Sequence, residues 1–62
     1  MIVPFTDAAA GTNVYINPDY VVSLRPDPTD PDGLSLAKLR DGEMIRLRGG
    51  HREVADKLRI AA

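Results

Sequence analysis

The segment from Leu34 to Leu58 constrains the fold of this chain more than any other stretch. It consists of an apolar run, Asp41-Gly42, a second alternating run, the glycine pair Gly49-Gly50 and a helix-like stretch. Asp-Gly between apolar segments is among the strongest hairpin signals, because a type I′ turn needs positive φ at both central positions. The sequence therefore predicts a β-hairpin with a two-residue turn, followed by a short C-terminal helix.

A two-residue turn fixes which residues of the two strands lie opposite each other. Arg40 would face Glu43, an opposite-charge cross-strand pair. Directly opposed residues share a face, and faces alternate along each strand. The core side of the hairpin would then carry Leu34, Leu36, Ile45 and Leu47, with Lys38 near the tip. The other side would carry Ser35, Ala37, Arg46 and Arg48, with Leu39 and Met44 near the turn.

The stretch from His51 onward has the pattern of an amphipathic helix. Apolar residues recur there at helical spacing, at Val54, Leu58 and Ala61 or Ala62. A helix of about a dozen residues is marginal by itself in water. We therefore expect it to pack on the sheet, with Val54 and Leu58 as its attachment points.

The upstream part of the chain contains short strand-like segments: Met1 to Thr6, Asn13 to Asn17, and Tyr20 to Arg25. Pro4 lacks an amide donor, which makes the first an edge strand or the ragged start of one. In the second, Tyr15 lies on the face opposite Val14 and Ile16. In the third, Tyr20, Val22 and Leu24 alternate with Val21, Ser23 and Arg25.

The connections between these segments are rich in turn-forming residues. Asn17-Pro18-Asp19 predicts a bend, because Pro pre-sets φ and the Asn side chain accepts local hydrogen bonds. Asp7 to Thr12 is predicted as a loop, and Pro26 to Gly33, with three prolines and three aspartates, as a stiff solvated loop. The sequence thus predicts an α+β fold, a small antiparallel four-stranded β-meander with a C-terminal amphipathic helix packed on one face.

Chain length and composition limit the class of protein. The 62 residues, taken as one domain spanning 1–62, include no cysteine and three aromatic residues, so the core must be mostly aliphatic. A chain this short buries only about 60% of its unfolded surface, and oligomerisation is one way to add buried area. The net charge is −1, and no run is long enough to span a bilayer. We expect a cytoplasmic protein without membrane contact.

Motifs that would carry catalysis or metal binding are not complete in this sequence. Placing Gly33 at the sixth position of a calcium loop puts Pro28 first and Leu39 twelfth, where acidic ligands are required. His51 is the one histidine, and the sequence offers no spaced Ser or Cys with an acid for a triad. We therefore predict a non-enzymatic protein with no catalytic residue, no metal site and no cofactor.

Two surfaces are candidate binding sites for a partner molecule. Leu39 and Met44 are predicted on the non-core side of the hairpin, where Tyr15 and Val21 could join them in a protein-partner or oligomer surface. The alternative is a nucleic-acid contact through the strand arginines Arg25, Arg46 and Arg48. The balanced net charge and the lack of an exposed aromatic stripe make that alternative the weaker hypothesis.

The order of several short motifs resembles a known family. Val14-Tyr15-Ile16-Asn17, Asp41-Gly42, Glu53-Val54 and Lys57-Leu58 are arranged over nearly the full chain as in the small FlbD/SwrD-type flagellar and motility proteins. This resemblance implies a non-enzymatic bacterial accessory to flagellar regulation or motor power, acting through protein contacts, with no catalytic residues to transfer.

The segment from Leu36 to Leu58 also resembles the closing hairpin and helix of LytTR-type DNA-binding domains. That resemblance implies a small nucleic-acid-binding regulator. A regulator of phage or mobile-element origin is equally compatible with the sequence.

Overall fold

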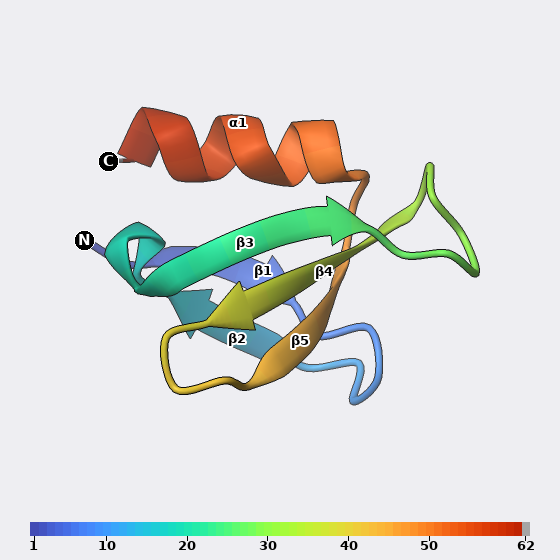
Figure 1. Ribbon diagram of the computed structural model, residues 1–62, viewed down its shortest axis with the longest axis horizontal. Coiled ribbons are helices and arrows are strands. Elements are labelled where there is room, and N and C mark those ends of the chain that lie inside the picture. The colour runs from blue at the N-terminus through green and yellow to red at the C-terminus, as the bar shows by residue number, and fades with distance from the viewer. Residues whose placement is uncertain (62) are drawn as a thin grey trace.

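Five antiparallel strands and one helix make up the computed structural model, which describes residues 1–61. In chain order the elements are β1 (Val3–Thr6), β2 (Asn13–Ile16), the single-turn 3₁₀ helix η1 (Pro18–Tyr20), β3 (Val21–Pro26), β4 (Leu34–Leu39), β5 (Met44–Arg48) and α1 (His51–Ala61). β1 pairs with β2, and β3, β4 and β5 form a second sheet in that order (Figure 1). The α+β class is confirmed, but the predicted single four-stranded meander is wrong.

The bend after β2 explains why the strands divide into two sheets. Asn17 Oδ1 accepts a hydrogen bond from the Asp19 backbone N–H at 3.0 Å, as predicted, and Pro18 has no N–H to give to a ladder. The chain therefore turns through η1 before β3 begins. A bridge between Asp7 and Leu47 connects β1 to β5 instead, so the two sheets meet along that line.

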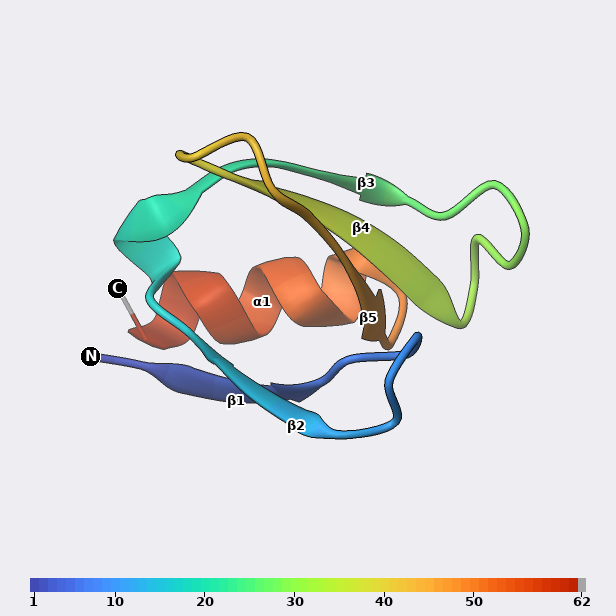
Figure 2. The same cartoon turned by 90° about the horizontal axis from the view of Figure 1, so that it is seen from below.

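The helix covers the opening between the two sheets. Figure 2 shows the β1–β2 pair diverging from the three-stranded sheet, with α1 seen between them. Val54 and Leu58 are buried, which confirms them as the attachment points of the helix. The core comprises Phe5, Ile16, Ala37, Leu39, Ile45, Leu47, Val54 and Leu58. Ala62 and the side chain of Ala61, the third predicted helix contact, lie outside what the structure describes.

The β4–β5 hairpin forms, but its turn is one residue longer than predicted. The Leu39 N–H donates to the Glu43 carbonyl at 2.8 Å, and the Gly42 N–H donates to the Leu39 carbonyl at 2.9 Å. The loop is thus Arg40 to Gly42. Gly42 has φ +90°, while the non-glycine residues among 1–61 all have negative φ, so Asp41 is not in a type I′ turn. The predicted Arg40–Glu43 cross-strand pair is therefore wrong.

The longer turn changes which side of β4 faces the core. Leu36 lies opposite Arg46, and Ser35 lies opposite Leu47. A register shift of one residue moves every side chain of a strand to the other face. The buried side of β4 is consequently Ser35, Ala37 and Leu39, while Leu34 and Leu36 are half-buried on the outer side. For β5 the predicted faces are confirmed, with Ile45 and Leu47 inside and Met44, Arg46 and Arg48 outside.

An irregularity in β3 breaks the alternation predicted for that strand. The register shifts between Val21 and Ser23, which marks a β-bulge. Val21 and Leu24 both pack against the core, and Val22 is exposed. The prediction that Val22 and Leu24 share a face is therefore wrong. Tyr20, predicted to start this strand, belongs to η1.

Two glycines set the path from β5 into α1. Gly49 has φ +110°, and its N–H donates to the Gly33 carbonyl at 2.8 Å. A β-carbon at Gly50 would lie 2.9 Å from the Asp32 carbonyl oxygen. The chain therefore needs glycine here for two different reasons, backbone conformation at Gly49 and close approach at Gly50.

Candidate interaction surfaces

An apolar hollow of about 380 Å³ opens between β2, η1 and the β4–β5 hairpin. We call it the tyrosine hollow. Two tyrosines, Tyr15 and Tyr20, line it together with Ile2, and their exposed fractions are 60%, 43% and 61%. The remaining lining residues are Val14, Ile16, Asn17, Leu39, Glu43 and Ile45. The hollow is thus a mostly apolar concavity that keeps two aromatic side chains accessible.

The residues predicted as a partner surface are not brought together on one face. Leu39 is 8% exposed and belongs to the core, so its predicted position on the outer side is wrong, because the hairpin register is shifted. It nevertheless borders the tyrosine hollow together with Tyr15. Met44 is exposed on the outer side of β5, and Val21 is half-buried against the core. Tyr20 and Ile2, which complete the hollow, were missed because parts of the chain that are distant in sequence meet there.

The outer side of the three-stranded sheet carries four cations, which we call the basic face: Arg25, Lys38, Arg46 and Arg48. Arg25, Leu36 and Arg46 form one row across β3, β4 and β5, and Lys38 lies opposite Met44 in the next. The three arginines predicted as nucleic-acid contacts therefore share a side of the sheet. Lys38 was placed on the core side by the sequence, again because of the hairpin register.

Asp27, just after β3, is buried beneath this side, with 1% of its surface exposed. Arg46 Nε lies 2.5 Å from Asp27 Oδ2, a pairing of charges without the alignment of a hydrogen bond. Asp27 Oδ1 accepts hydrogen bonds from the Thr29 backbone N–H at 2.9 Å and the Thr29 hydroxyl at 2.8 Å. The prediction of a fully solvated Pro26–Gly33 loop is therefore wrong at this residue. The Asp-x-Thr spacing, typical of a local side-chain turn, is the signal that could have found it.

The environment of Asp27 favours its charged form. Hydrogen bonds from the backbone and then the hydroxyl of Thr29 lower the pKa of the Asp27 carboxyl below its ordinary value, and the nearby Arg46 charge adds to this effect. Burial acts in the opposite direction but does not outweigh them. The ionised carboxylate is thus a structural partner that holds the loop turn and the Arg46 side chain.

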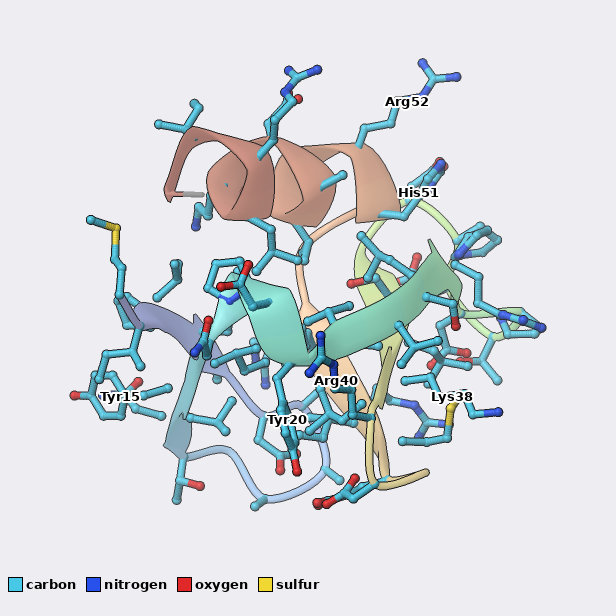
Figure 3. All side chains as sticks on the ribbon, turned by 60° about the vertical axis from the view of Figure 1, so that its left-hand side comes forward. Tyr15, Tyr20, Lys38, Arg40, His51 and Arg52 are labelled. Atoms are coloured by element: carbon cyan, nitrogen blue, oxygen red, sulfur yellow. The ribbon has the colours of Figure 1, made fainter. Side chains whose placement is uncertain are left out.

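The lone histidine and the acidic residues are the candidate metal ligands of this chain. His51 is half-buried at the start of α1 (Figure 3), and within residues 1–61 no three His, Asp or Glu side chains gather as a set of metal ligands. Helix α1 is neither long nor apolar enough to cross a membrane. The two candidate interaction surfaces are the tyrosine hollow and the basic face.

In comparisons with known proteins, the chain matches no model of a protein family, no curated protein and no solved structure.

Proposed function

We propose that this chain is a non-enzymatic accessory protein that acts through protein–protein contacts, with the tyrosine hollow as its contact surface. The observation that carries the proposal is the hollow itself, where Tyr15, Tyr20 and Ile2 stay accessible around a buried apolar floor. Tyrosines are enriched in protein interfaces, because a rigid ring contributes a large contact area and its hydroxyl can still hydrogen-bond at the rim. The hollow therefore suits an apolar anchor from another protein surface.

The small size of the chain supports a role in an assembly. A domain of 62 residues has little core of its own, and a partner or second copy covering Tyr15 and Ile2 would add buried apolar area. The resemblance to FlbD/SwrD-type proteins suggests the setting, so we further propose regulation of bacterial flagella or motility as the process served.

The proposal is tested by replacing one wall of the hollow. Tyr15→Ala removes an exposed ring without touching the core, and Ile60→Ala removes an exposed apolar side chain on α1, outside the hollow. Light scattering and co-purification are expected to show an oligomer or a bound protein that Tyr15→Ala loses and Ile60→Ala retains. A strictly monomeric protein at high concentration, with no associated protein, would contradict the proposal.

Nucleic-acid binding through Arg25, Arg46 and Arg48 stays a prediction. The common face of these arginines favours it, while the engagement of Arg46 by Asp27 weighs against it. A mobility-shift assay over a range of salt concentrations tests this alternative, because affinity carried by phosphate contacts falls steeply with added salt.

A further inference from the structure

The basic face combines cations with aliphatic side chains on one accessible side of the sheet. Its rows are Ser23–Lys38–Met44, Arg25–Leu36–Arg46 and Leu34–Arg48. Neighbouring strands are about 4.8 Å apart, so Arg25 and Arg46 start about 10 Å from each other. The leucines between them are half-buried, and Met44 is 48% exposed. The surface thus alternates positive charge with apolar contact area.

Charge is unevenly distributed over the molecule. The whole chain has net charge −1, yet this side of the sheet carries four cations against one carboxylate, that of Asp27. The other acidic residues lie in loops and turns, in η1 and on α1, at Asp7, Asp19, Asp30, Asp32, Asp41, Glu43, Glu53 and Asp56. Among the described residues, ion pairs engage Arg46, Lys57 and Arg59, so the other three cations of this face, Arg25, Lys38 and Arg48, carry no ion pair.

The composition of this face distinguishes between two kinds of anionic partner. Proteins that bind unpaired nucleic acid combine a basic groove with aromatic rings on which bases stack, and the three rows contain no aromatic ring. Aliphatic side chains between cations instead match a protein segment that carries both carboxylates and apolar residues. Arginine pairs well with carboxylate, and apolar contacts at the centre of an interface supply much of the affinity.

We propose that the basic face binds an acidic, amphipathic segment of a partner protein. Its carboxylates pair with Arg25, Lys38 and Arg48, and its apolar side chains cover Met44 and the part of Leu36 that the Arg46 stem leaves exposed. This inference rests on the proposed role in protein contacts. It concerns a surface separate from the tyrosine hollow, so it can fail while the proposed function of the hollow still stands.

The test is an amide NMR titration of the full chain with a synthetic peptide in which Glu and Leu alternate. Binding is expected to shift the amides of β3, β4 and β5. The double variant Arg25→Glu/Arg48→Glu should weaken binding by about tenfold or more, since each removed charge pair is replaced by a repulsion. Arg52→Glu makes the same change of charge on α1, where the side chain projects away from the sheets and from Lys38 (Figure 3), and should bind like the wild type.

Other outcomes would overturn this inference, and the measurement distinguishes them from a failure of the proposed function. Shifts confined to the residues around Tyr15 would move acidic-peptide binding to the tyrosine hollow and leave the proposed function standing. Absence of binding, or equal loss in Arg52→Glu, would remove the basic face as a specific site. If duplex DNA binds more tightly than the peptide and is lost in the same double variant, the face is a nucleic-acid site instead.

Discussion

Arg46 on β5 extends across the full width of β4 to pair with Asp27, the residue that follows β3. The order β3–β4–β5 places the two residues on opposite sides of the central strand, and yet Nε and Oδ2 are 2.5 Å apart. The stem of the arginine therefore lies over the outer side of β4, where Leu34 and Leu36 are half-buried. One ion pair thus links the outer strands of the sheet and orders the loop after β3.

The first prediction concerns acid stability. Because the folded-state pKa of Asp27 lies below its unfolded value, the ionised carboxylate stabilises the fold fully above about pH 5, and this stabilisation is lost as the pH falls through the folded pKa. Asp27→Asn should lower the unfolding midpoint at pH 7. It should also flatten the loss of stability between pH 5 and pH 2, roughly the window in which a paired carboxylate is protonated. Thermal unfolding followed by circular dichroism at a series of pH values measures both effects.

Asp32→Asn is the matched control, because Asp32 lies in the same loop with its side chain exposed. Its pH profile should follow that of the wild type. Parallel profiles for Asp27→Asn and the wild type would show that the buried carboxylate makes no pH-dependent contribution.

The second prediction tests the hairpin register. Leu39→Ala removes a core side chain and should reduce the free energy of unfolding by about 2–5 kcal/mol. Leu36→Ala removes the same atoms from the half-buried outer side and should cost about 1 kcal/mol. Urea unfolding of both variants compares them. The two-residue turn would reverse this order, so a larger loss at Leu36 would contradict the observed register.

The turn shows how far local sequence determines the hairpin. Asp41-Gly42 marks its position correctly, because the two-residue and three-residue loops both place glycine at positive φ. In β4, leucines occur at both even and odd positions, with Leu34 and Leu36 on one side of the strand and Leu39 on the other. The alternation of apolar and polar residues therefore cannot select the register. In β5, arginines alternate strictly with Ile45 and Leu47, and there the predicted faces are right.

The candidate surfaces depend on contacts between distant parts of the chain. The pairing of Asp27 with Arg46 joins positions that no local pattern links, and the tyrosine hollow needs β2, η1 and the hairpin in place. Tyr15 was identified because its exposure follows from alternation within one strand. Lys38 and Leu39 were placed on the wrong sides because their positions depend on a register set by the turn.

The third prediction concerns Ser35, which is fully buried on the core side of β4 and whose hydroxyl has no hydrogen-bond partner among residues 1–61. Ser35→Ala removes this buried polar group and should raise the free energy of unfolding by about 1 kcal/mol. The reciprocal change, Ala37→Ser, adds a hydroxyl at the next buried position of the same strand and should cost about 1–3 kcal/mol. Chemical denaturation gives both values. A loss of stability in Ser35→Ala would mean that the hydroxyl is satisfied after all.

The last prediction concerns the entry into α1. Gly49 has φ +110°, a conformation that residues with a β-carbon rarely adopt, and a β-carbon there would also lie 3.2 Å from Glu53 Oε2. Gly49→Ala should therefore cost about 1–3 kcal/mol. The loss should appear as weaker amide-exchange protection in α1, because the direction of the helix depends on this residue. Gly11→Ala is the control: its φ is +74°, and a β-carbon there meets open space. It should cost about 1–2 kcal/mol and leave helix protection close to the global value. Equal protection of α1 in both variants would show that Gly49 does not govern the docking of the helix.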